Sequence, residues 1–147
     1  MSTQPQPIAD RNREVARRYF QVLWNGRDLE SATGLVAEDI VGHVHGDTLH
    51  GRDTLLDRVL AVHSAYPDGR FALEDMIVER DKVGVRWTFH GTNTGEYLGE
   101  VATGRAVHVT GMNILRISGE QIVEMWIQSD DLGEREQLGW IGEHHRS

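Results

Sequence analysis

The sequence contains no cysteine, which excludes disulfides, thiolate metal ligands and cysteine nucleophiles. It also lacks an excess of basic residues: 15 Lys and Arg stand against 23 Asp and Glu, so the net charge is −8 at pH 7. This balance argues against binding to nucleic acid or to an anionic membrane surface, because both require a basic patch. No apolar run is long enough to cross a membrane, and no signal-type apolar segment follows Met1. We therefore expect a soluble, cytoplasmic protein.

The 147 residues are enough for a single domain over 1–147 with a sizeable core, and we expect residues 1–8 to fray. Helical spacing of apolar residues predicts helices over 10–25, 29–36 and 54–64. Strands are predicted over 40–45, 71–79, 83–90, 105–117 and 122–130. Three helices followed by long antiparallel strands indicate an α+β fold with segregated layers. A strongly curved, mostly antiparallel sheet with the three N-terminal helices on its concave side would enclose one pocket.

The last two predicted strands form a hairpin around Ser118-Gly119-Glu120-Gln121, a glycine-containing turn. Counting outward from a two-residue turn pairs Ile117 with Ile122 and Asn113 with Trp126. Side chains alternate along a strand, so each strand contributes to two faces. One face then carries Val109, Gly111, Asn113, Leu115, Glu124, Trp126, Gln128 and Asp130, and the other carries Met112, Ile114, Val123, Met125 and Ile127. The first face has the polar and aromatic mixture of a pocket wall, whereas the second is apolar.

Several short motifs occur in a characteristic order. They are Tyr66-Pro67-Asp68, His90-Gly91, Thr103-Gly104-Arg105 and Glu124-x-Trp126-x3-Asp130-x2-Gly133-x3-Gln137-Leu138-Gly139. With these motifs the chain resembles the SnoaL-like polyketide cyclases, also called ester cyclases, of the ketosteroid-isomerase-like (nuclear transport factor 2-like) superfamily. The resemblance implies a cone-shaped α+β barrel with one deep pocket, commonly an oligomer, and neither a metal nor an organic cofactor.

The resemblance also suggests a catalytic carboxylate. In the cyclases of this family an Asp at the place of Asp130 acts as acid and base in an intramolecular aldol ring closure. It takes the proton beside a carbonyl and later protonates the new alkoxide. Apolar neighbours such as Trp126 would strengthen a carboxylate as a base by desolvating it. The alternative is that Asp130 only caps the turn into the segment that follows.

Four further residues are candidates for the catalytic site. Asn113 stands where some aldol-type cyclases carry His; its amide can donate to an oxyanion but cannot shuttle a proton, and the alternative is a bond that fixes the hairpin. Tyr19 stands where the steroid isomerases place their oxyanion Tyr, or else belongs to the apolar stripe of the first helix. His43 and His45, which alternate onto one strand face, lie near the place of the isomerases' catalytic carboxylate. An imidazole there would serve as a general base at neutral pH.

The pair His43-x-His45 also invites a metal interpretation, with His50, His90 or His108 as a third ligand. No carboxylate at a fixed spacing completes a known ligand set, so we predict no metal. The remaining pocket residues are predicted to line the wall without taking part in proton transfer. They are Trp126, Gln128, Val109, Trp87 and His90.

The hypothesis from sequence is a cofactor-independent cyclase that closes a ring in a small, apolar, polyketide-like carbonyl substrate by acid/base catalysis. The same pocket could instead serve double-bond isomerisation, ether-ring formation or epoxide opening. A non-catalytic protein that binds a small apolar ligand is a further alternative. The apolar hairpin face requires a cover, which predicts a homodimer or higher homo-oligomer.

Overall fold

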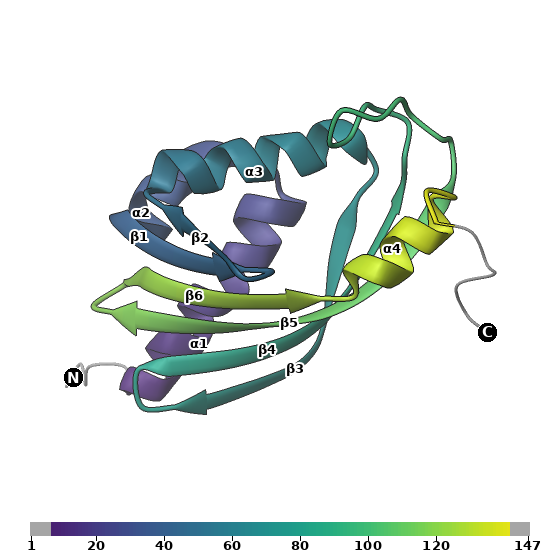
Figure 1. Cartoon of the computed structure of the whole chain (residues 1–147). Coiled ribbons are helices and arrows are strands. Elements are labelled where there is room, and N and C mark those ends of the chain that lie inside the picture. Colours follow the sequence, from purple (N-terminus) through teal and green to yellow (C-terminus); the bar gives the residue numbers. More distant parts are fainter. Residues whose placement is uncertain (1–6, 142–147) are drawn as a thin grey trace.

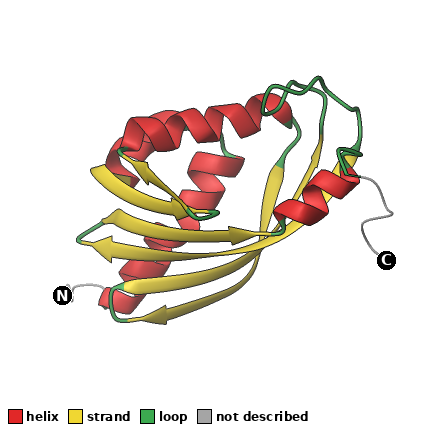
Figure 2. Cartoon of the chain, viewed as in Figure 1, coloured by secondary structure: helices red, strands yellow, loops and turns green. Residues whose placement is uncertain are grey.

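The computed structural model describes residues 7–141 and contains a six-stranded sheet with helices on one side (Figures 1 and 2). The strands are β1 (Val36–Val44), β2 (Asp47–His50), β3 (Arg70–Glu79), β4 (Lys82–Thr92), β5 (Ala106–Ser118) and β6 (Gln121–Ser129). The helical segments are α1 (Ile8–Arg18), η1 (Tyr19–Asn25), η2 (Leu29–Ser31), α2 (Ala32–Leu35), α3 (Arg52–Ala65) and α4 (Asp131–Gln137). Of the segment expected to fray, residues 1–6 lie outside the described residues and Ile8 begins α1.

The strand order is β2-β1-β6-β5-β4-β3. The pair β1–β6 is parallel, and the other four pairs are antiparallel. The sheet curves strongly around α1, η1 and α3 (Figure 1), and the apolar core fills the space between these helices and the concave face. The predicted α+β architecture is therefore confirmed. Among residues 7–141, no helix is long and apolar enough to span a bilayer.

The first predicted helix consists of two parts. α1 passes directly into η1, a π-helical segment in which the backbone N–H of Gly26 donates to the carbonyl of Gln21 at 2.9 Å. A π-helical turn is wider than an α-helical one and occurs often at functional sites. The four buried side chains of η1 all face the concave side of the sheet, namely Tyr19, Phe20, Leu23 and Trp24. This segment supplies one wall of the cavity described below.

Two of the predicted elements differ from the structure in length. The helix expected over 29–36 is only the short 3-10 turn η2 followed by the four-residue α2. Val36 already has extended backbone angles, so β1 begins four residues earlier than expected. At its other end β1 stops at Val44, and His45 lies in the turn with a φ of 51°. His43 and His45 therefore do not share a strand face, contrary to the prediction.

The register of the β5–β6 hairpin was predicted wrongly. Ile117 does pair with Ile122, but a β-bulge follows, and Arg116 pairs with Glu124. Val123 is the extra residue, and a bulge of this kind inserts one unpaired residue that shifts all later pairs. Asn113 consequently lies opposite Ile127 and not opposite Trp126.

The bulge redistributes the hairpin side chains between the two faces of the sheet. The concave face receives Asn113 and Leu115 together with Met125 and Ile127, all of which are buried. The convex face receives Met112 and Ile114 together with Glu124, Trp126 and Gln128. The bulge thus lets Ile122, Met125 and Ile127 all enter the core, which a regular strand with this spacing would not allow.

The loop of residues 93–105 is held by a fully buried side chain, Asn93. Its Oδ1 accepts hydrogen bonds from the backbone N–H (2.8 Å) and the hydroxyl (3.0 Å) of Thr103. Its Nδ2 donates to the carbonyls of Gly95 (2.9 Å) and Ala65 (3.3 Å). Because Ala65 ends α3, this one side chain ties the loop to the helix. The loop carries Tyr97, which reaches the cavity.

We expect Asn93→Ala to lower the free energy of unfolding by about 2 kcal/mol, because buried polar groups of the loop lose their partners. Urea unfolding of both proteins would measure the difference. Thr94→Ala is the matched control, because the neighbouring Thr94 is exposed and its loss should change stability by less than about 0.5 kcal/mol. Equal stabilities of the two variants would contradict the anchoring role of Asn93.

Candidate active site

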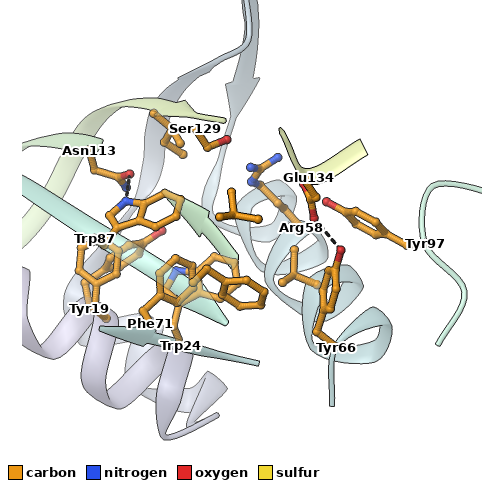
Figure 3. Close-up of a pocket in the computed structure, with 15 residues that line it drawn as sticks. Tyr19, Trp24, Arg58, Tyr66, Phe71, Trp87, Tyr97, Asn113, Ser129 and Glu134 are labelled. Carbon is orange, nitrogen blue, oxygen red and sulfur yellow. Dashed lines mark hydrogen bonds between the residues drawn. The ribbon is translucent and has the colours of Figure 1, made fainter. Parts of the chain in front are cut away.

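A cavity of about 70 Å³ lies between η1, α3 and the concave face of the sheet (Figure 3). Most of its wall is aromatic or aliphatic, and a few polar groups converge on it, as is usual for small-molecule sites. The lining residues are Tyr19, Phe20, Trp24, Arg58, Val62, Tyr66, Phe71, Trp87, Phe89, Tyr97, Val109, Asn113, Ile127, Ser129 and Glu134.

The amide of Asn113 is held in one orientation. The Nε1–H of Trp87 donates to Asn113 Oδ1 at 2.9 Å, and both residues are buried. An indole N–H can only donate, so the amide oxygen faces Trp87 and the amide NH₂ faces away from it. Within residues 7–141 this NH₂ group has no hydrogen-bond partner. Asn113 therefore presents a free donor at a wall of the cavity.

The indole of Trp87 is itself fixed by packing. Its ring meets Phe71 edge to face with centroids 4.9 Å apart. It also lies directly over Gly111, where a Cβ atom would come within 2.2 Å of the ring. Only glycine leaves room for the indole at this place. Gly111 and Asn113, which the sequence places on one strand face, thus both contact Trp87.

Glu134 contributes a partly buried carboxyl group to the opposite side of the cavity (Figure 3). The hydroxyl of Tyr66 donates to its Oε2 at 2.7 Å. Burial raises the pKa of Glu134, although this hydrogen bond and the nearby Arg58 and Arg135 act in the other direction. Burial likewise raises the pKa of Tyr97 to about 12 and raises the pKa of Tyr66. Both phenols are therefore neutral donors at pH 7.

Sequence analysis missed Glu134. The signal was its spacing from Leu138, since residues four apart lie on the same face of a helix. Leu138 is buried in the core, so Glu134 is directed towards the interior by the same face of α4. From sequence alone, the acidic segment after the second hairpin strand was interpreted as a turn. Without a helix there, the four-residue spacing of Glu134 and Leu138 does not indicate a shared face.

The structure brings together four of the residues selected from sequence: Tyr19, Trp87, Val109 and Asn113 line the cavity. Tyr19 is buried, and its hydroxyl donates to the sulfur of Met125 at 3.8 Å. Burial raises the pKa of Tyr19, so its hydroxyl keeps its proton.

Asp130 lies outside the cavity lining. Its side chain is exposed and caps α4, with Oδ1 accepting from the backbone N–H of Gly133 at 2.9 Å. A Cβ at position 133 would come within 2.1 Å of this carboxylate, so Gly133 is required for the cap. This geometry matches the capping alternative for Asp130. Its catalytic role stays a prediction.

The three other residues assigned to the pocket wall lie elsewhere, and for these the prediction was wrong. Trp126 lies on the convex face and stacks on His43, with ring centroids 5.4 Å apart. Gln128 follows on the same face and is exposed. His90 is also exposed and stacks on its cross-strand neighbour His108 at 4.6 Å. For Trp126 and Gln128 the cause is the bulge at Val123.

The two histidines of the His-x-His motif have different surroundings. On the convex face, Nε2 of His43 lies 2.8 Å from Glu124 Oε2, and Arg116 Nε lies 3.1 Å from Oε1 of the same carboxylate. The contacts with His43 and Arg116 lower the pKa of Glu124. His45 lies beside a polar groove next to the cavity, 3.3 Å from Ser129 Oγ. Among residues 7–141, no three His, Asp or Glu side chains form a group that could hold a metal ion.

Comparison with known proteins gives a family match and a set of similar structures. The model of the SnoaL-like polyketide cyclase family matches residues 14–138. No curated protein sequence matches the chain at a significant level.

Three solved structures illustrate the likeness. A candidate SnoaL-like polyketide cyclase from Jannaschia sp. CCS1 has a TM-score of 0.86 at 20% identity, with 96% of this chain and 100% of that chain covered. AclR, a candidate hydroxylase from Streptomyces galilaeus, has a TM-score of 0.82 at 21% identity over 92% and 85% of the two chains. IdmH, a candidate polyketide cyclase from Streptomyces antibioticus, has a TM-score of 0.76 at 27% identity over 87% and 98%. Proteins of this one fold are thus described as candidate cyclases in two cases and as a candidate hydroxylase in the third.

The raised pKa of Glu134 predicts a pH dependence of stability. Because the folded protein binds this proton more tightly than the unfolded chain, the stabilisation is complete below the ordinary value of 4.5 and is lost as the pH rises through the folded value. Glu134→Gln cannot ionise, so the wild type should lose stability relative to this variant as the pH rises from 4.5. Urea unfolding across this range would measure it. Glu120→Gln, at the exposed tip of the β5–β6 hairpin, is the control; parallel profiles for wild type and Glu134→Gln would contradict the prediction.

Proposed function

Because the chain belongs to the SnoaL-like polyketide cyclase family, we propose that it is a cofactor-independent enzyme that closes a ring in a small, apolar carbonyl substrate. Proton transfer is assigned to Glu134. The observation that carries this assignment is a partly buried carboxyl group with a raised pKa in an aromatic cavity, opposite the free amide donor of Asn113 (Figure 3).

The proposed reaction begins with the ionised form of Glu134. Its carboxylate takes a proton from the carbon beside a substrate carbonyl, and the carbonyl oxygen becomes an enolate. The NH₂ of Asn113 donates a hydrogen bond to this oxygen, and Trp87 keeps the amide turned the right way. The enolate carbon then attacks a second carbonyl of the same substrate, and a carbon–carbon bond forms. Glu134 returns its proton to the resulting alkoxide.

The surroundings of Glu134 suit both halves of this cycle. A carboxyl group with an ordinary pKa is a weak base at neutral pH, and desolvation brings its pKa towards the value at which it can both accept and return a proton. Tyr66 donates to Oε2, which leaves Oε1 for the substrate. Tyr19 adds a second neutral donor near the sheet, because its hydroxyl donates to a sulfur atom, which is a weak acceptor.

Asp130 remains the second candidate for the acid/base role, since it occupies the motif position that resembles the catalytic Asp of the cyclases. Isomerisation, ether-ring formation and epoxide opening would use the same donors and the same carboxyl group. A protein that binds an apolar ligand without turnover is the non-catalytic alternative. These possibilities differ in which carboxylate transfers the proton. They also differ in whether the proton on the carbon beside the carbonyl is exchanged.

The test is hydrogen–deuterium exchange at the carbon beside the carbonyl of 2-tetralone, an enolisable bicyclic ketone, followed by NMR in D₂O. We expect the wild type to accelerate the exchange and Glu134→Gln to lower the rate at least about a hundredfold, the scale of general acid–base catalysis. Asp130→Asn is the matched control, because Asn caps helices as well as Asp does, and its rate should change less than about threefold.

A large loss of exchange in Asp130→Asn with little change in Glu134→Gln would transfer the acid/base role to Asp130. Equal rates for the wild type and both variants would contradict a carboxylate mechanism altogether. Saturable binding of the ketone without accelerated exchange would support the non-catalytic alternative.

The family resemblance also motivates a proposal about assembly, namely that the convex face of the sheet meets a second copy of the chain. The paired residues Ile77, Gly84, Ile114, Trp126 and His43 form one row across five strands on this face. Ile77 is 72% exposed and Ile114 44%, and the neighbouring Met112 is 57% exposed. Ile77, Ile114 and Met112 thus leave apolar side chains exposed on the convex face, and such exposed apolar surface often marks a protein interface.

We expect the wild type to sediment as a homodimer or higher homo-oligomer at micromolar concentration and Ile114→Asp to sediment as a monomer, because a buried unpaired carboxylate opposes association. Leu60→Asp is the control, since Leu60 is similarly exposed (48%) but lies on α3. A monomeric wild type in sedimentation equilibrium would contradict the proposal.

A further inference from the structure

Arg58 is a cation at the mouth of the cavity whose charge is not matched by an ion pair. It projects from α3 and lines both the aromatic cavity and a neighbouring polar groove of about 460 Å³. Figure 3 shows its guanidinium group between Ser129 and Glu134. Within the part of the chain that the structure describes, Arg58 makes no hydrogen bond and no ion pair. Partly buried guanidinium groups are usually paired.

The two spaces share a boundary. Arg58, Tyr97, Ser129 and Glu134 line both the cavity and the groove, so a ligand can occupy the two together. The cavity side is aromatic, whereas the groove side is polar. Its other residues are Val44, His45, Asp47, Thr48, Leu49, Thr54, Leu98, Asp131 and Arg135. A ligand that spans the boundary therefore has its inner part against the apolar wall of the cavity and its outer part beside Arg58.

Apart from Asp47, the other carboxylates and the second arginine at this boundary have hydrogen-bond or ion-pair partners. Arg135, the second cation of the groove, is bonded to Asp131 at 2.9 Å and lies over the ring of Trp140. Glu134 accepts a hydrogen bond from the hydroxyl of Tyr66. Asp47 lies at the exposed start of β2. None of these carboxylates lies within ion-pair distance of Arg58, which leaves the guanidinium able to receive an anion from the ligand.

We propose that Arg58 binds a carboxylate group of the ligand, so that the substrate class is a small apolar compound with a free acid at one end. The apolar body would lie among Trp24, Phe71 and Trp87, with the acid at Arg58 and within reach of the Ser129 hydroxyl. A guanidinium group offers paired N–H donors that match the two oxygens of a carboxylate. The inference names the substrate class of the catalytic site described above and in that sense rests on the proposed function.

The carboxylate at Arg58 also fixes the direction in which the ligand lies. With the acid held at the groove, the rest of the molecule extends inward past Glu134 towards Asn113. The reacting carbonyl would then lie between the proton carrier and the oxyanion donor. A neutral ester or amide of the same compound would lack this anchor. The site should therefore bind the acid more tightly than its ester or amide.

The test compares two ligands that differ in charge and hardly in shape, 4-phenylbutanoate and 4-phenylbutanamide, by isothermal titration calorimetry at pH 7. We expect the wild type to bind the acid at least about tenfold more tightly than the amide, the scale of a charge-assisted hydrogen bond. Arg58→Met keeps a long apolar side chain and should remove this preference by weakening the acid alone. Arg58→Lys keeps the charge and should retain part of the preference.

Arg86→Met is the matched control, because Arg86 is an arginine of β4 that is paired with Asp75 and lines neither the cavity nor the groove; its preference for the acid should equal that of the wild type. Amide binding serves as the internal check that each variant is folded. A wild type that binds both ligands equally, or binds neither at millimolar concentration, would overturn the proposal. So would an acid preference that survives in Arg58→Met, or a loss of amide binding equal to the loss of acid binding.

The outcome is separable from that of the proposed function. Glu134→Gln should keep the preference for the acid even though it loses proton exchange on 2-tetralone. An acid preference in a protein without exchange activity would support the anion site and contradict the enzyme. Exchange activity without an acid preference would support the enzyme and contradict the anion site.

Discussion

The bulge at Val123 is the constraint on which the arrangement of the site depends. It places Met125 and Ile127 on the concave face beside Asn113, and Asn113 then meets Trp87 on the neighbouring strand. Without the extra residue, Trp126 would enter the core and the apolar Met125 and Ile127 would face outward. A single unpaired residue thus decides which hairpin side chains surround the ligand and which form the convex surface.

Sequence patterns were sufficient for the architecture because long strands and helices carry strong periodicity. The same reasoning found Asn113, Tyr19, Trp87 and Val109, which owe their place in the cavity to β5, η1 and β4. It failed for Trp126 and Gln128, because a bulge has no periodic signature and shifts every later pair. It also missed Glu134, because its spacing from Leu138 has meaning only once α4 is known to be a helix, and Arg58, because the absence of an ion pair has no sequence signature.

The polar groups of the cavity divide into two kinds. Asn113 and Trp87 form a rigid pair set by the sheet and by Gly111. Glu134 and Arg58 come from helices on the other side and are not joined to each other. Low local polarity strengthens both the hydrogen bonding of the first pair and the charge effects of the second. The cavity therefore combines a fixed donor on the sheet side with a carboxyl group and a cation near its mouth.

The parallel pairing of β1 with β6 has a consequence for synthesis of the chain. His43 and Glu124, which meet across this pair, are separated by 81 residues, and contacts at such separation form slowly. On the ribosome, β1 is made long before its partner, and its apolar residues must wait for β6 to emerge. The helix that supplies Glu134 follows β6. The cavity is therefore among the last parts of the molecule that a nascent chain can assemble.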